Sequence, residues 1–123
     1  MGRIQLALVG IGGAAGALVR WGIVSEWAGN GFPWTTLVVN AVGCALLGVV
    51  TSRPVSTDVK RLLGTGFCGG LTTFSTFAVE IVQLLDRGSP GTAAAYVLVS
   101  IAMGLAVFVA ARAMAAPPAG VDS

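Results

Sequence analysis

Four long apolar stretches constrain this chain more than any other feature. Crossing the hydrocarbon core of a bilayer as a helix takes about 20 mostly apolar residues, and each stretch is close to that length. They run from about Ile4 to Trp27, Trp34 to Ser52, Arg61 to Leu85 and Thr92 to Met114. The connections between them are short and rich in turn-forming residues, so neighbouring helices are expected to run antiparallel. The sequence therefore predicts an all-α membrane protein, with four transmembrane helices in a single domain over residues 1–123.

Composition supports a membrane protein and excludes several functional classes. Hydrophobic residues make up 55% of the chain and charged residues only 10%, whereas soluble domains average about a quarter charged. The basic residues form no cluster beyond Lys60 and Arg61, so no nucleic-acid partner is expected. Histidine is absent, and no nucleophile has a base partner, so the chain is not expected to be an enzyme. Cys44 and Cys68 lack metal-site spacing and are predicted to be small packing residues.

The basic residues are unevenly divided between the two ends of the predicted helices. Arg87 and the more deeply placed Arg20 lie toward one end. The remaining basic residues lie on the side of the termini, namely Arg3, Arg53, Lys60, Arg61 and Arg112. The positive-inside rule then predicts cytoplasmic termini.

Small residues recur at four-residue spacing in three of the apolar stretches. The pairs are Gly12 with Gly16, Gly66 with Gly70, and Ser100 with Gly104. Lipid supplies no hydrophobic drive between helices, so such spacing works by letting two backbones approach closely. Because four short helices enclose little interior, we expect some of these faces to contact a second subunit. Packing within one chain is the alternative.

The third stretch contains an unusual polar motif, GFCGGLTTFSTFAVE, from Gly66 to Glu80. The double glycine at positions 69 and 70, followed by hydroxyl residues, predicts a break in the helix, which is tolerated inside a membrane only in buried or cavity-lining backbone. A break exposes carbonyl groups to a cation and starts a half-helix whose N–H groups favour an anion. Phe74 and Phe77 share one face, where ring edges act as weak donors to an anion.

Other polar residues inside the spans also need partners. Asn40 lies in the middle of the second span, and its amide is difficult to satisfy at that depth. The hydroxyl residues of the motif have a simpler alternative, which is hydrogen bonding to the preceding helical turn. Arg20 and Glu80 are the charged residues set well inside a span. Arg20 is either an anion attractor at a vestibule or an interfacial anchor beside Trp21.

These residues also resemble a known family. The motif GFCGGLTTFSTF, with NAVGC in the second stretch and GGAAGALVRW in the first, resembles the Fluc (CrcB) fluoride channel family over nearly the whole chain. The resemblance implies an antiparallel, dual-topology homodimer whose two subunits build two fluoride pores. It also implies passive export of fluoride across the cytoplasmic membrane of a bacterium.

The resemblance assigns roles to individual residues. Phe74, Phe77 and Asn40 match pore-lining positions, and Arg20 matches an arginine near the vestibule. Tyr96 and Ser100 match the start of a polar track along the fourth helix. Thr73, Ser75 and Thr76 lie in the matching motif of the third helix and are assigned a supporting role in the pore. The backbone carbonyls of Gly69 and Thr72 match the ligands of a structural sodium ion on the dimer axis.

Two departures and two rival functions remain open. Gly104 stands where the family's polar track often continues with a hydroxyl residue. The uneven distribution of Lys and Arg fits a subunit of fixed topology that pairs with an oppositely oriented paralogue. One rival is a small proton-coupled multidrug exporter, for which Glu80 is the available carboxylate. The other is a membrane assembly subunit that transports nothing.

Overall fold

The computed structural model describes residues 2–27, 29 and 31–118, and the described chain is helical. Four helical spans are long and apolar enough to cross a membrane, as predicted. Two of the residues in the predicted first turn, 28 and 30, lie outside the described residues. The elements are α1 (Arg3–Trp27), α2 (Trp34–Ser52), α3 (Thr57–Val59), the π-helical segment η1 (Lys60–Cys68), α4 (Gly69–Leu71), α5 (Phe74–Asp86) and α6 (Pro90–Ala115).

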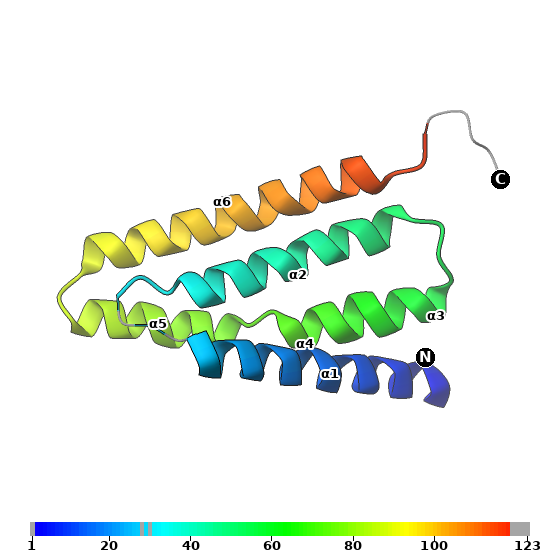
Figure 1. Ribbon diagram of the computed structural model, residues 1–123, viewed down its shortest axis with the longest axis horizontal. Coiled ribbons are helices and arrows are strands. Elements are labelled where there is room, and N and C mark those ends of the chain that lie inside the picture. The colour runs from blue at the N-terminus through cyan, green and yellow to red at the C-terminus, as the bar shows by residue number, and fades with distance from the viewer. Residues whose placement is uncertain (1, 28, 30, 119–123) are drawn as a thin grey trace.

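The third span is built from four of these elements in two halves. α3, η1 and α4 form a continuous helical first half, and α5 forms the second half. Figure 1 shows α2 between α6 and the third span, with α1 alongside the first half of that span. The first and last helical residues, Arg3 and Ala115, lie at the same end of the bundle, as expected for four antiparallel helices.

Local sequence explains where the helices begin and end. The Ser56 hydroxyl accepts a hydrogen bond from the backbone N–H of Val59 and caps the start of α3. Pro90 occupies the first turn of α6, where its missing N–H costs no helical bond. Gly88, in the turn before it, has a φ of 72°, which side chains with a Cβ rarely adopt.

Glycines hold α1 against the first half of the third span. A Cβ added to Gly16 would lie 2.2 Å from the Phe67 carbonyl oxygen, and one added to Gly70 would lie 2.1 Å from the Gly13 carbonyl oxygen. At Gly12, the added atom would lie 3.1 Å from Gly66 Cα. The two predicted glycine pairs therefore pack against each other within one chain, which is the alternative to a subunit contact for these faces.

A small hydrophobic core lies between α2, α5 and α6. Its most buried members are Leu37, Leu84, Ala93 and Tyr96, with Phe77 packed against them. Many apolar side chains elsewhere are exposed in the isolated chain, as expected for surfaces that face lipid or another subunit.

Candidate functional site: a groove at the helix break

The third helix opens at Thr72 and Thr73, where the backbone becomes extended. Thr72 has φ −77° and ψ 154°, and Thr73 has φ −143° and ψ 124°. The prediction of a break near the middle of this span is confirmed, but the prediction that the ladder opens at the double glycine is wrong. Gly69 and Gly70 remain helical in α4. Gly70 instead provides close contact with α1, a role that depends on its missing Cβ and not on backbone freedom.

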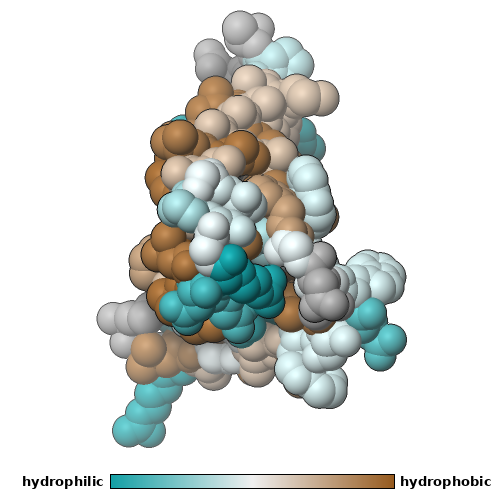
Figure 2. Space-filling view, turned by 90° about the vertical axis from the view of Figure 1, so that its left-hand side faces the viewer, coloured by the Kyte–Doolittle hydropathy of each residue, from teal (hydrophilic) through white to brown (hydrophobic). Residues whose placement is uncertain are grey.

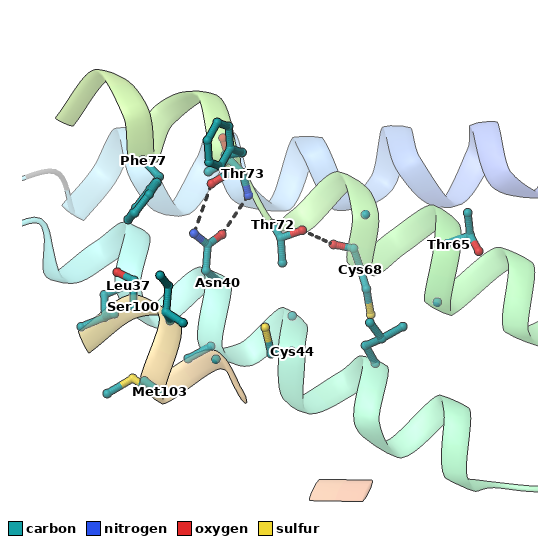
Figure 3. A pocket seen from close by; sticks show the side chains of 18 residues that line it. Leu37, Asn40, Cys44, Thr65, Cys68, Thr72, Thr73, Phe77, Ser100 and Met103 are labelled. Atoms are coloured by element: carbon teal, nitrogen blue, oxygen red, sulfur yellow. Dashed lines mark hydrogen bonds between the residues drawn. The ribbon is translucent and has the colours of Figure 1, made fainter. Parts of the chain in front are cut away.

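Asn40 spans the opened backbone from the neighbouring helix α2. Its Nδ2 donates to the Thr73 carbonyl oxygen at 3.2 Å, and the Thr73 N–H donates to Asn40 Oδ1 at 2.8 Å (Figure 3). One amide thus satisfies both polar backbone groups of a residue that the helix cannot satisfy. A second amide proton of Asn40 remains for another acceptor.

The second half of the broken helix starts with a side-chain cap. Thr73 Oγ1 accepts from the Thr76 N–H at 3.0 Å and lies 3.2 Å from Ser75 Oγ. The amides of Phe74 and Ser75 begin α5 and have no carbonyl one turn earlier in their own helix. The positive end of the α5 dipole is therefore directed at the break, as an anion site requires.

The first half of the helix ends with carbonyl groups released from the ladder. In a continuous helix the N–H groups of Thr73 and Thr76 would bond to the carbonyls of Gly69 and Thr72. Here those two N–H groups donate to the side chains of Asn40 and Thr73 instead. Carbonyl oxygens are ligands for hard cations, so the predicted pair of sodium ligands fits its expected role. The Thr72 hydroxyl itself bonds back to the Cys68 carbonyl at 2.9 Å, as the simpler interpretation of these hydroxyls predicted.

A groove of about 670 Å³ lies between α2, the third span and α6, beside this break. Of the residues predicted to line or support a pore or to bind sodium, seven line the groove, namely Asn40, Gly69, Thr72, Thr73, Phe74, Phe77 and Ser100. Within the described residues, the buried Ser100 hydroxyl has no hydrogen-bond partner. Gly104, the departure from the family pattern, also lines the groove and adds no polar group. Arg20, Ser75, Thr76 and Tyr96 are not among the lining residues.

The two phenylalanines lie at one end of the groove as neighbours on α5. Their ring centroids are 5.9 Å apart and their planes are tilted by 43°. Phe77 is partly buried and also contacts Tyr96, with centroids 5.0 Å apart. Phe74 is 79% exposed in the isolated chain, beside opened backbone at membrane depth. Such backbone is tolerated in lipid only when protein or a water-filled cavity covers it, so this face requires a cover.

Sequence reasoning missed a cluster of three polar residues next to the phenylalanines. The Thr36 hydroxyl donates to Glu80 Oε1, and the Tyr96 hydroxyl donates to Glu80 Oε2 at 3.0 Å. Tyr96, predicted to belong to the polar track, is fully buried and lies between the Glu80 carboxylate and the Phe77 ring. Two signals were available. Glu80 is a carboxylate inside a span, and Thr36 lies one helical turn before Asn40 on the same face of α2.

A second hollow, of about 260 Å³, reaches Glu80 from the other side. Thr36, Glu80 and Arg87 line it, together with residues of the connection between α1 and α2. It lies at the bundle end that Figure 2 views, where hydrophilic atoms gather in the middle and hydrophobic atoms flank them. The ring contact of Phe77 with Tyr96 and the hydrogen bond of Tyr96 to Glu80 connect a residue that lines the groove to one that lines the hollow.

Arg20 makes a contact that neither of its two predicted roles includes. Its Nε donates to the Gly70 carbonyl oxygen at 3.1 Å. Gly70 lies in the last turn before the break, so the guanidinium group occupies the negative end of the first half-helix.

Comparison with known proteins identifies the family of this chain. Residues 7–112 match the family model described as CrcB-like protein, Camphor Resistance (CrcB). The chain belongs to the CrcB family. Curated relatives include "Fluoride-specific ion channel FluC 1" of Mycolicibacterium paratuberculosis, 48% identical over 82% of both chains. The FluC channel of Bordetella avium is 47% identical over 83% of this chain and 85% of its own, and that of Rhizobium johnstonii is 38% identical over 90% and 95%.

Proposed function

We propose that this CrcB family member is a fluoride-selective channel that exports cytoplasmic fluoride by passive conduction. The observation that carries the proposal is the groove at the helix break. There the start of α5, the Asn40 amide, the unpaired Ser100 hydroxyl and two phenyl rings surround one space. The names of the curated relatives support fluoride as the ion. They give no support to the multidrug-exporter alternative.

The groove suits a small anion that must lose its water. Amide N–H groups, a hydroxyl and ring edges replace hydrating water as donors, while no single donor binds the ion so strongly that it cannot leave. Within the described residues, no lysine or arginine lines the groove, so the route offers no fixed positive charge that would trap the ion. Selectivity against chloride then follows from width, since chloride is larger.

We further propose that two antiparallel copies of the chain close two such grooves into two pores. The carbonyls of Gly69 and Thr72 released at the break supply the physical reason, because lipid hydrocarbon offers no hydrogen-bond partner for polar backbone. A second copy related by a two-fold axis would cover both grooves at once. The location proposed for this dimer is the cytoplasmic membrane of a bacterium.

The released carbonyls of Gly69 and Thr72 would hold a structural sodium ion between the two copies. A hard cation takes more oxygen ligands than one chain offers here, so a shared site uses the same carbonyls of both copies. When bound, the ion would supply positive charge at the negative ends of two half-helices and fix the position of the break. The basic bias toward the terminal end leaves a paralogue of opposite orientation as the alternative partner.

Flux measurements on this chain expressed alone test the proposal. Proteoliposomes loaded with potassium fluoride should release fluoride when valinomycin carries the balancing potassium, and those loaded with chloride should not release chloride. The F77I variant should abolish release, whereas F108I, an equal substitution on α6 away from the groove, should not. Equal release of chloride, or no release above that of empty vesicles, would reject a fluoride channel. Release that requires a co-expressed paralogue would reject the homodimer.

A further inference from the structure

Arg20 lies on the same stripe of α1 as the glycines that contact the third span. Gly12, Gly16 and Arg20 follow one another at four-residue spacing, so they project from one face of the helix. The glycines bring the α1 backbone into contact with η1 and α4, because an added Cβ at Gly16 would lie 2.7 Å from the Leu71 backbone nitrogen. One turn further along, the same stripe carries the Arg20 Nε to the Gly70 carbonyl at 3.1 Å.

The carbonyl that Arg20 binds belongs to the end of the first half-helix. α4 ends at Leu71, so the N–H groups one turn later no longer hold the last carbonyls in line. Two backbone segments near the break are instead held by side chains from neighbouring helices. Asn40 of α2 holds the Thr73 backbone, and Arg20 of α1 holds Gly70.

We infer that Arg20 is a positioning residue for the cation-binding side of the break. Gly70 lies between Gly69 and Thr72, whose carbonyls form the proposed sodium site, so the bond to Arg20 fixes the backbone segment between the two ligands. A charged donor also gives a stronger and shorter hydrogen bond than a neutral one. This inference rests on the proposed sodium site and assigns Arg20 a role other than attracting anions.

The two roles predict opposite effects of removing the charge. If Arg20 acts only through its charge, its loss relieves repulsion of a nearby cation, and sodium binds more tightly. If Arg20 positions the carbonyls, its loss leaves the segment free to move, and sodium binds more weakly. A lost hydrogen bond to a charged group corresponds to about a tenfold change in affinity.

Backbone amide exchange at the break, followed by mass spectrometry, reads the effect without relying on flux. The full-length protein in detergent is compared as wild type, R20M, R20K and the control R3M, which changes an exposed arginine of the same helix. With N-methylglucamine as the cation, R20M should speed exchange in residues 66–76 and leave α6 unchanged. When sodium is titrated in, the concentration that half-protects this segment should rise about tenfold in R20M, less in R20K and not at all in R3M.

Several results would overturn the inference. A sodium midpoint that falls or stays the same in R20M contradicts positioning, and so does exchange at the break that matches R3M. If sodium does not change amide exchange at the break in the wild type, the break does not bind this cation and the inference fails. Fluoride flux in R20M that drops by the same factor at every sodium concentration supports the vestibule role instead.

If R20M does not fold, the sodium midpoint of R20K decides, because the ammonium group keeps the charge and alters the geometry of the hydrogen bond. The proposed function is tested separately: it is rejected if proteoliposomes that contain the wild-type protein release no fluoride.

Discussion

Replacing Asn40 by Leu tests whether one amide holds the helix break in place. The substitution removes the donor to the Thr73 carbonyl at 3.2 Å and the acceptor for the Thr73 N–H at 2.8 Å. Each buried polar group left without a partner costs about 1–3 kcal/mol, so the ordered break should lose about 2–6 kcal/mol. Even the lower figure shifts the equilibrium between the ordered and disordered break about thirtyfold.

The expected result is a protein that still inserts as four helices but conducts poorly. Fluoride efflux from proteoliposomes should fall sharply, and amide exchange should accelerate at Thr72 to Phe74 without a comparable change in α6. The control is Thr51→Ala on the same helix, because the Thr51 hydroxyl only bonds back to the preceding turn. If the Leu variant kept both normal efflux and normal exchange, Asn40 would not be the residue that stabilises the break.

Three further variants test the packing, the pore and the buried carboxylate. Gly16→Ala should lower the thermal midpoint strongly, because its Cβ would lie 2.2 Å from a backbone carbonyl oxygen, whereas Gly10→Ala has open space and should be neutral or stabilising by up to about 1 kcal/mol. Phe74→Ile should abolish fluoride efflux with little change in the stability of the monomer, since the ring is 79% exposed. Glu80→Gln should destabilise the fold by about 1–3 kcal/mol in thermal unfolding, because an amide nitrogen cannot accept from a hydroxyl group as a carboxylate oxygen does.

For each of these variants, one result would contradict the prediction. Equal thermal midpoints for Gly16→Ala and Gly10→Ala would mean that α1 does not contact the third span closely. Normal efflux in Phe74→Ile would remove that ring from the fluoride route. For Glu80→Gln, the matched control is Glu26→Gln at the exposed end of α1. Unchanged stability relative to that control would mean that the Thr36 and Tyr96 hydroxyls do not depend on the carboxylate.

The helical spans could be predicted because each depends on the hydropathy of its own continuous stretch of residues. The predicted second span, from Trp34 to Ser52, coincides with α2, and the first differs from α1 by one residue. The neighbouring phenylalanine rings also followed from spacing, since residues three apart share a helical face. The position of the break did not follow, because the double glycine has two possible uses. A glycine permits an opened ladder and also permits close helix contact, and only a packed neighbour decides between them.

The sequence by itself determined that this chain forms four apolar helices, that the third is interrupted, and that its polar residues concentrate at the interruption. These features depend on hydropathy and on residue spacing, which act over a few helical turns. The tertiary structure decided which side chains satisfy the polar groups near the break: Asn40 bonds to the Thr73 backbone and Arg20 to the Gly70 carbonyl, while Thr36 and Tyr96 bond to the Glu80 carboxylate. These partners come from other helices, and hydrogen bonds form over about 3 Å, so the partners are set by how the helices pack.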